Sequence, residues 1–517
     1  MSFYLPSGSD FRRKYTYTEG IDYMIKNVVF VQPKSVGGNF EYVAIPRQGM
    51  LFLSAALKQH VERAKDGLSR IANWVYDTRV WFEDKVGKLD ILKDLQGVDI
   101  LCVSGLVNEI PRAYEIARLA KQFFPNMRVI GGGPHMGMLP EEAIEYGHFD
   151  VIVKHEGEDV MGPLADVLLS FEGDDLTREL GKFGGIAFKE NGSVVETPKR
   201  RTIPSDYVEL PDYSAVVGLT PQTPWAAGVI ETVRGCTENC SYCEVIQQFL
   251  GYRMVRRETE WKRLRQLQEL AADGLIMASP IDGRFAVFVT DDLHPPPSRA
   301  VKFRNERMER IKRWVGRSEG MFLICQTRAE LGQDPEMCEG LRRIGIDMLY
   351  VGVETNNAEN LAAVNKRQDP TQADKDLRAL QGWGFSNVAM TIIGLPADTE
   401  EKIMNMADWV KEVSKYQTAN LLTPLPATIN WDLLRPLDED GSLLPPGKMR
   451  PYEKYTGKQL VHYDPRWTMQ ESAGLYQRYT DRLRPVDRLY ARIFQMIRRR
   501  SETTGAAMPQ KVLAVSN

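Results

Sequence analysis

Three cysteines stand close together in a chain that otherwise has few. Cys236, Cys240 and Cys243 lie within eight residues of a 517-residue sequence that holds six cysteines in all. Three thiolates on one loop can hold three irons of an iron–sulfur cluster and leave a fourth iron open to another ligand. A structural zinc site requires a fourth Cys or His nearby, and the next ones along the chain are His294 and Cys325. A disulfide would leave one thiol over. The spacing therefore favours a three-cysteine cluster site.

The composition is that of an ordinary globular protein, with 43% hydrophobic and 26% charged residues. The net charge of −3 provides no basic surface for nucleic acid, so no nucleic-acid partner is expected. No apolar run approaches the roughly 20 residues that span a bilayer. The N-terminus has charges throughout and no apolar core, unlike a signal peptide. These features predict a cytoplasmic protein, where reducing conditions suit an oxygen-sensitive cluster.

The cysteine loop needs a scaffold, and two blocks of the sequence alternate short apolar runs with helical patterns. In the first block we expect strands at residues 27–33, 98–104, 127–130 and 149–153, with helices at 48–60, around 113–120 and from about 140. This alternation predicts a doubly wound, Rossmann-like parallel sheet. Ligands of such sheets bind beyond the carboxyl ends of the strands. Ser104, Gly105 and the glycines at 131–133 lie at those ends, where a missing side chain lets a large ligand approach the backbone.

The second block follows a segment rich in Pro and turn residues, and the cysteine loop comes directly after its first strand. Strands are expected at residues 229–233, 285–290, 322–326, 348–353, 388–393 and 418–423. Together they predict a partial parallel (β/α)6 barrel, in which chemistry sits at the strand C-termini. We expect an N-terminal segment at 1–26, a Rossmann-like domain at 27–190, a linker at 191–225, a barrel at 226–430 and a helical C-terminal cap at 431–517. The fold class is α/β.

The cysteine loop also carries a recognisable signature. CTENCSYC, residues 236–243, has the spacing C-x3-C-x2-C with an aromatic residue, Tyr242, before the last cysteine. By this motif the chain resembles the radical S-adenosylmethionine (SAM) enzymes. The resemblance implies a [4Fe–4S] cluster on the three cysteines, with SAM chelating the open iron through its amino and carboxylate groups. It also implies that one electron from the cluster cleaves SAM to methionine and a 5′-deoxyadenosyl radical.

The order of the parts narrows the resemblance further. A Rossmann-like block, a linker and a three-cysteine barrel resemble the cobalamin (B12)-binding radical SAM subclass over about residues 27–470. The segments that carry it are residues 28–33, 48–57, 131–135, 140–142, 155–158, 210–213 and 422–426. The resemblance implies that cobalamin lies near Ser104, Gly105, Gly131, Gly132, Gly133, His135 and Glu156.

One departure concerns the lower face of cobalt. The Asp-x-His-x-x-Gly motif, whose histidine ligates cobalt in mutases and methionine synthase, is absent, and the one Asp-x-His sequence, at residues 292–294, lies in the barrel. We therefore expect an open or water-bound lower face, as in members of the subclass that lack the motif. His135 is expected to position the nucleotide tail or to cap the following helix rather than to ligate cobalt. Residues 155–158 (HEGE) are either close to the cofactor or a polar turn.

In the barrel, the family resemblance implies contacts to each part of SAM. Residues 289–292 stand where the family has a Gly-Gly-Glu-like segment, so Asp291 or Asp292 accepts from the SAM ammonium or serves as a helix N-cap. Glu354 matches the position facing the ribose or carboxylate. Arg328 pairs with the SAM carboxylate or is a solvated arginine. Gly394 matches the adenine-contacting strand, and its alternative is a simple turn.

Two basic segments are interpreted as structural helices rather than as binding surfaces. Residues 252–265 carry glutamates among the arginines at spacings typical of a solvated helix. Residues 484–500 place apolar residues opposite arginines, which indicates a terminal helix packed on the barrel or, as the alternative, contact with a membrane surface.

The resemblance implies methylation of an unactivated carbon. The 5′-deoxyadenosyl radical removes a substrate hydrogen, the carbon radical takes a methyl group from methylcobalamin, and a second SAM restores that methyl group. The main alternative uses the same cofactors for oxidative cyclisation or ring rearrangement, as in tetrapyrrole cyclases. A non-catalytic cobalamin sensor and a methylthio-transferring enzyme are further alternatives; the latter needs more N-terminal cysteines than Cys102. We expect a small-molecule, lipid or tetrapyrrole substrate and a one-electron reductant such as flavodoxin or ferredoxin.

Overall fold

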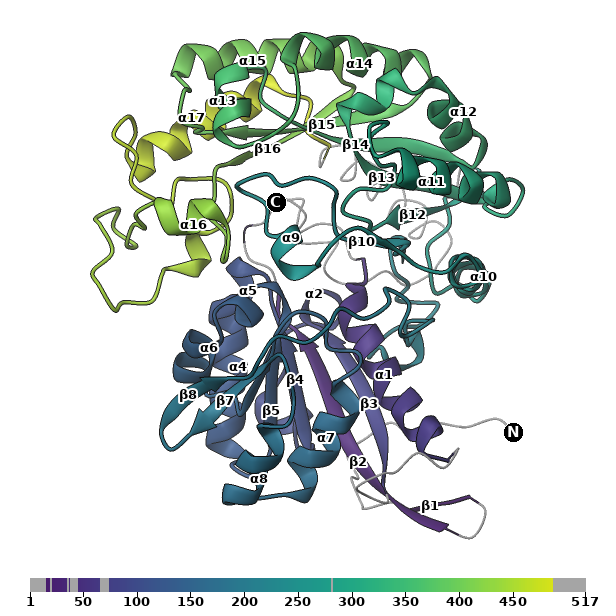
Figure 1. Cartoon of the computed structure of the whole chain (residues 1–517), viewed down its shortest axis with the longest axis vertical. Helices are drawn as coiled ribbons and strands as arrows, with labels where there is room; N and C mark the ends of the chain where they lie inside the picture. Colours follow the sequence, from purple (N-terminus) through teal and green to yellow (C-terminus); the bar gives the residue numbers. More distant parts are fainter. Residues whose placement is uncertain are drawn as a thin grey trace.

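The computed structural model describes residues 15–18, 21–34, 37, 45–65, 74–279 and 282–486 of the chain. Two β-sheets, each covered by helices, lie one above the other in Figure 1. The first sheet, in purple and blue, forms the lower body, and the second, in green, forms the upper body. A teal segment that contains the short helix α9 (Val245–Gln248) lies between them.

The first sheet has eight strands in the order β1-β2-β4-β5-β6-β7-β8, with β3 also paired to β2. Strands β3, β2, β4, β5 and β6 are parallel neighbours. Strand β1 pairs antiparallel with β2, while β7 and β8 add an antiparallel edge. The strand bounds are β1 Tyr15–Thr18, β2 Ile21–Gln32, β3 Trp74–Phe82, β4 Ile100–Ser104, β5 Arg128–Gly132, β6 Val151–Val153, β7 Ile186–Glu190 and β8 Ser193–Glu196.

Both faces of this sheet are covered, because successive side chains of each strand point to opposite sides. Val28 and Phe30 of β2 pack into a core shared with helices α1 (Gln48–Lys65) and α7 (Met161–Ser170). Val29 and Val31 pack into a second core with α4 (Ile110–Phe123) and α6 (Pro140–Gly147). The shorter helices of this body are α2 Glu83–Val86, α3 Ile91–Asp94, η1 Val107–Glu109, α5 Gly133–Met138 and α8 Gly173–Leu180.

The second sheet has six strands, all parallel, in the order β16-β15-β14-β13-β12-β9. Each strand lies beside the one before it in this series, as in a partial barrel. The bounds are β9 Gly228–Ile230, β12 Phe285–Val289, β13 Met321–Arg328, β14 Ile346–Glu354, β15 Ser386–Ile393 and β16 Tyr416–Leu421. A two-stranded ribbon of β10 (Val233–Arg234) and β11 (Arg253–Met254) brackets the cysteine loop.

Helices between the strands cover the outside of this sheet. They are α10 Arg257–Ala272, α11 Val301–Trp314, η3 Ala329–Gln333, α12 Pro335–Arg343, α13 Ala358–Ala363, α14 Pro370–Gly382 and α15 Glu400–Val413. The basic segment predicted as a helix therefore lies largely in α10. The predicted α/β class, with a doubly wound sheet followed by a six-stranded partial barrel, is confirmed.

The C-terminal region combines helices with long irregular stretches. Its elements are α16 Ile429–Leu433, η4 Tyr452–Lys454 and α17 Met469–Arg482, and α17 packs on α15. The Tyr452 hydroxyl donates to Glu142 Oε2 at 2.6 Å, which ties this region to the first body. Most of the basic segment at 484–500 lies outside the described residues.

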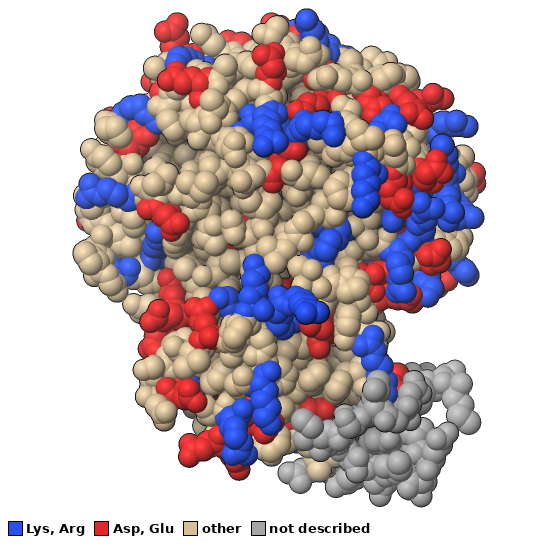
Figure 2. Space-filling view, viewed as in Figure 1, with Lys and Arg blue, Asp and Glu red and all other residues tan. Residues whose placement is uncertain are grey.

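The face of the molecule seen in Figure 2 carries both signs of charge. Figure 2 shows acidic and basic side chains interspersed over the visible face, with a group of basic side chains near the narrowing between the two bodies. Among the described residues, no helix combines the length and the apolar character that crossing a membrane requires.

Candidate active site

A cavity lies where the carboxyl edge of the first sheet meets the cysteine-loop segment of the second. It encloses about 1130 Å³ of empty space, part of it open to solvent. From the first body it is lined by Ser104, Gly105, Gly131, Gly132, Gly133, His155, Glu156 and Glu158, among others. From the second body it is lined by Glu231, Arg234, Gln248 and Phe249. The two halves of the chain therefore share one site.

Glycine is required in the cavity wall for two different reasons: backbone geometry at one position and space for a ligand at another. Gly133 has φ +88°, and a Cβ there would lie 2.2 Å from Ser104 Oγ, so the β5–α5 turn itself excludes a side chain. Gly49, in the first turn of α1, also lines the cavity, but no described atom lies within 4 Å of a Cβ built on it. A side chain at Gly49 would enter open space in the cavity, and sequence reasoning missed this position.

His155 adds an unpaired polar atom to the same wall. Its Nδ1 is buried without a hydrogen-bond partner among the described residues, and its backbone has φ +59°. Left-handed backbone at a non-glycine residue costs of order 1 kcal/mol or more and often marks a functional site. The open space at Gly49, the free ring nitrogen and the cavity size fit a large polar cofactor such as cobalamin.

His135 lies elsewhere. Its ring is 1% exposed and does not line the cavity; Nε2 lies 3.4 Å from Glu142 Oε1, and the ring packs edge-on against Tyr452 at 4.5 Å. Burial lowers the pKa of His135, although the neighbouring Glu142 carboxylate acts in the opposite direction. The structure thus places His135 in α5, packed against the C-terminal region, and its relation to cobalamin stays a prediction.

The cysteine loop is held in place by backbone contacts on two sides. Gly235, just before Cys236, has φ +85°, and a Cβ there would lie 1.9 Å from the carbonyl oxygen of Gly251. On the other side, the Ser241 amide donates to the carbonyl of Val364 at 3.0 Å. The position before the first cysteine therefore accepts only glycine.

The donor set of the loop fits a cluster of several irons. The three cysteines are partly exposed free thiols on one loop, and among the described residues no three metal-ligating side chains converge as a single-ion site requires. A four-iron cluster binds each thiolate at a different iron, which needs wider spacing than one ion does. Burial raises the pKa of the Cys243 thiol to about 12, and nearby Cys236 and Cys240 add to this. Iron stabilises thiolates in such a setting.

Of the two predicted SAM-contacting aspartates, Asp291 has both carboxylate oxygens engaged by groups of the protein. Its Oδ1 accepts from the amides of Thr232 and Val233, at 2.5 and 2.8 Å, and its Oδ2 lies 2.7 Å from His294 Nδ1. Although burial opposes it, contacts with His294, Arg307 and Thr232 lower the pKa of Asp291. Asp291 thus fixes the chain between β9 and the cysteine loop.

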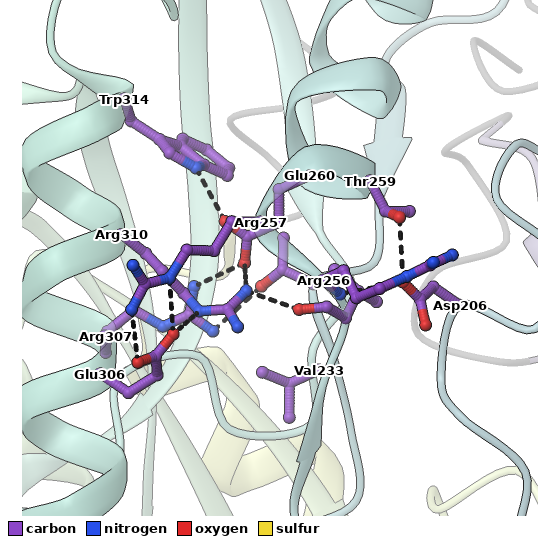
Figure 3. Close-up of polar contacts among 12 residues, drawn as sticks. Asp206, Val233, Arg256, Arg257, Thr259, Glu260, Glu306, Arg307, Arg310 and Trp314 are labelled. Atoms are coloured by element: carbon purple, nitrogen blue, oxygen red, sulfur yellow. Dashed lines mark hydrogen bonds and ion pairs between the residues drawn. The ribbon is translucent and has the colours of Figure 1, made fainter.

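Behind Asp291 lies a buried ion cluster that supports the same strand end. Arg307 Nη2 donates to Thr232 Oγ1 at 3.0 Å and lies 3.7 Å from Asp291 Oδ2. Figure 3 shows Arg310 and Trp314 of α11 directed at Glu260 of α10, at 2.6 and 3.2 Å. These contacts join the two outer helices to the base of the cysteine loop.

Asp292 is the aspartate that faces the loop. Its Oδ2 accepts from the Gly235 amide at 3.2 Å, and burial raises its pKa to about 7. Arg328, at the end of β13, is buried rather than solvated and contacts the loop through Glu238. Its Nη2 donates to the carbonyl of Arg367 at 2.5 Å, and its Nη1 lies 3.8 Å from Oε2 of Glu238, which stands between the first two cysteines.

Glu354 meets the loop at its aromatic residue. The Tyr242 hydroxyl is hydrogen-bonded to Glu354, and burial together with that carboxylate raises the pKa of Tyr242. Lys366 Nζ donates to Glu354 Oε1 at 2.7 Å, and Glu354 has φ +61° at a register shift between β14 and β15. Gly394, at the end of β15, has φ +81° with Leu421 and Leu460 close by. The structure brings Asp292, Glu354 and Gly394 to the strand C-termini, and their contacts with SAM stay predictions. Sequence reasoning missed Lys366.

Comparison with known proteins agrees with this arrangement. The description "B12 binding domain" matches residues 83–165, and "Radical SAM superfamily" matches residues 230–410. The chain is a cobalamin-dependent radical SAM enzyme. The order of the two bodies matches the order of these two domains, and the predicted cofactors, a [4Fe–4S] cluster, SAM and cobalamin, are confirmed.

The relatives of this radical SAM enzyme are mostly methyltransferases. An uncharacterized methyltransferase of Pyrococcus horikoshii is 26% identical over 65% of this chain and 69% of its own length. An anaerobic magnesium-protoporphyrin IX monomethyl ester cyclase of Cereibacter sphaeroides is 24% identical over 79% of this chain and 63% of its own. The methyltransferase TsrM from Kitasatospora setae, solved with cobalamin and a [4Fe–4S] cluster, shares the fold at a TM-score of 0.57 and 15% identity, over 78% of this chain and 74% of its own.

Proposed function

We propose that this radical SAM enzyme methylates an unactivated carbon of a small-molecule substrate. The observation that carries the proposal is the shared cavity, because the cobalamin-binding edge and the cysteine-loop segment line the same space. When bound, the cofactors supply a radical that removes a hydrogen atom and a methyl group for the resulting carbon. An electrophilic methyl donor alone does not react readily with such a carbon, which is why both cofactors are needed next to each other.

The chain's own residues hold and orient these groups. We propose that the three cysteines hold the cluster, with Asp291 and Gly235 fixing the path of the loop. Asp292 and Glu354 then offer carboxylate oxygens at the C-terminal ends of the barrel strands, where SAM must bind, and Gly394 lets the ligand approach the backbone. Ser104, Gly105 and Gly131–Gly133 form the edge for cobalamin. Glu354 is oriented by Lys366, because the ammonium group fixes one of its oxygens.

We propose domain limits that follow the sheets. Strand β8 ends at Glu196 and pairs with β7, so the cobalamin-binding domain extends to that residue rather than to 190. The barrel runs from Gly228 to Leu421 and the C-terminal region follows it. We further propose a cytoplasmic location and a one-electron protein reductant, because the cluster requires an electron for each radical it starts.

The test uses the reconstituted enzyme under anaerobic conditions, with SAM, cobalamin and dithionite. A methyltransferase forms S-adenosylhomocysteine and 5′-deoxyadenosine, and it transfers label from deuterated SAM methyl to cobalamin. A cyclase forms 5′-deoxyadenosine without moving the label, which would overturn the methyl-transfer proposal. A cobalamin sensor forms neither product. Cys236→Ala, Cys240→Ala and Cys243→Ala serve as matched controls, since each removes one ligand of the cluster.

A further inference from the structure

Arg234 joins the two domains at the wall of the shared cavity. It lies two residues before the first cluster cysteine, and its side chain is 6% exposed. Its Nη1 lies 2.8 Å from Glu156 Oε1 and 2.6 Å from Glu158 Oε1, both in the cobalamin-binding domain. Its Nε donates to Glu231 Oε1 at 3.0 Å, in the radical SAM domain. One guanidinium is therefore held by three carboxylates from two domains.

The surroundings complete this contact. Arg253 Nη2 donates to Glu156 Oε2 at 2.8 Å, so each oxygen of Glu156 holds an arginine of the other domain. Aromatic rings of the two domains, Phe52 and Phe249, lie 5.5 and 5.9 Å from the Arg234 guanidinium. We name Glu156, Glu158, Glu231, Arg234 and Arg253 the interdomain arginine cluster.

Burial makes the cluster sensitive to separation of the domains. A buried charge is tolerated when it is paired, and removing one partner leaves the other unpaired at high cost. Moving the cobalamin-binding domain away would break the contacts of Arg234 with Glu156 and Glu158, and removing one of these side chains by mutation would leave its partner buried and unpaired. The planar fork of an arginine also fixes direction, which the single ammonium of a lysine does not. The cluster therefore defines one relative position of the two domains.

We propose that Arg234 is a positioning residue that sets the cobalamin-binding edge relative to the cluster loop. This inference rests on the proposed function, in which the cobalamin and the iron–sulfur cluster serve one substrate carbon. It also gives residues 155–158 a role: Glu156 and Glu158 hold Arg234 and leave the glycines and His155 to face the cofactor. Because Arg234 continues through Gly235 into Cys236, its position is passed to the cluster loop by covalent bonds.

The test compares Arg234→Lys, Arg234→Gln and Glu158→Gln with the wild-type enzyme, all reconstituted with cluster and cobalamin. Arg304→Lys is the matched control, because Arg304 is held by Asp334 and Glu336 within the radical SAM domain. The first readout is the microwave power at which the electron paramagnetic resonance signal of cob(II)alamin saturates when the cluster is reduced. That power depends on the distance between the two paramagnets and does not require a substrate. The second readout is the dissociation constant for hydroxocobalamin.

We expect Arg234→Gln and Glu158→Gln to shift the saturation power and to bind cobalamin about tenfold more weakly, and Arg234→Lys to show smaller changes in the same direction. Arg304→Lys should match the wild type in both readouts. Glu158→Gln keeps Arg234 paired with Glu156 and Glu231, so it tests the idea even if Arg234→Gln does not fold. Unchanged saturation and cobalamin affinity in both Arg234→Lys and Glu158→Gln would overturn the inference. A wild-type enzyme that binds no cobalamin would instead overturn the proposed function.

Discussion

Lys366 Nζ lies 2.7 Å from Glu354 Oε1, and both side chains are almost fully buried at the C-terminal end of the barrel. The same carboxylate is hydrogen-bonded to Tyr242 of the cluster loop. This arrangement connects the residue proposed to face SAM with the loop proposed to hold the cluster. A change at Lys366 should therefore affect both stability and SAM binding.

Lys366→Met should destabilise the enzyme by about 3–5 kcal/mol, because it leaves the Glu354 carboxylate buried without its cation. SAM affinity should fall as well, since the orientation of Glu354 is lost. Chemical denaturation and equilibrium binding of SAM measure the two effects. Lys402→Met is the control, because Lys402 is exposed and its Nζ donates to the carbonyl of Ala397. Equal behaviour of the two variants would contradict the role given to Lys366.

Gly49→Phe should prevent cobalamin binding while leaving the fold intact. The position is helical and faces open space in the cavity, so a ring there takes the room of the cofactor without displacing protein atoms. Gly49→Ala is the matched control and should retain cobalamin, with helix stability raised by about 0.5–1 kcal/mol. Cobalamin retained on gel filtration, read by its visible spectrum, decides the matter. Full retention by Gly49→Phe would place the cofactor elsewhere.

Gly235→Ala should disrupt the cluster loop. The methyl group would lie 1.9 Å from the Gly251 carbonyl oxygen, and the backbone at φ +85° disfavours any side chain. We expect loss of most bound iron, measured per chain after anaerobic reconstitution. Gly251→Ala provides a comparison, because its φ is +77° but no described atom lies within 4 Å of its Cβ. If both variants lose iron alike, backbone strain rather than the contact is responsible.

Mild acid should destabilise the enzyme through His462. Its ring is 2% exposed, Nδ1 has no partner among the described residues, and burial lowers its pKa to about 4. The unfolded chain, with a histidine pKa near 6.5, binds the proton more readily, so stability falls as pH drops from about 6.5 towards 4. Between pH 7.5 and 5.5 this loss is about 1 kcal/mol for the one ring. Denaturation of His462→Phe at both pH values should show that much less pH dependence; an unchanged dependence would exclude His462 as its source.

The sequence predicted the elements whose apolar pattern is local. Strands β12 to β15 contain runs of apolar residues, and each of β12 to β16 was predicted within a few residues of its structural bounds. Strand β3 (Trp74–Phe82) was missed although its burial alternates regularly, because Asp77, Thr78 and Arg79 interrupt its apolar sequence. Strand β8 was read as the start of a linker because its four residues have little burial of their own.

The site was predictable where the ligating residues lie close together in the sequence at a characteristic spacing, as the three cysteines do. It was less so where a role depends on contacts between distant segments. Asp291 and Asp292 are adjacent in sequence, yet Asp291 accepts hydrogen bonds from backbone amides whereas Asp292 faces the loop. Arg234 and Lys366 gave no signal, because their partners Glu156 and Glu354 are 78 and 12 residues away. Gly49 appeared to be an unremarkable helix residue.

The hydrogen bond from Tyr452 to Glu142 connects the C-terminal region back to the cobalamin-binding domain. The chain passes from the cobalamin-binding domain to the barrel, continues into the C-terminal region and then returns to the domain in which it began. A single covalent linker would leave the two domains at a finite effective concentration, free to part and meet again. The contact between Tyr452 and Glu142 gives the two domains a second connection in addition to the linker. This second connection restrains the separation of the cobalamin-binding domain from the barrel, and it does so through a region that contributes no ligand to the cluster.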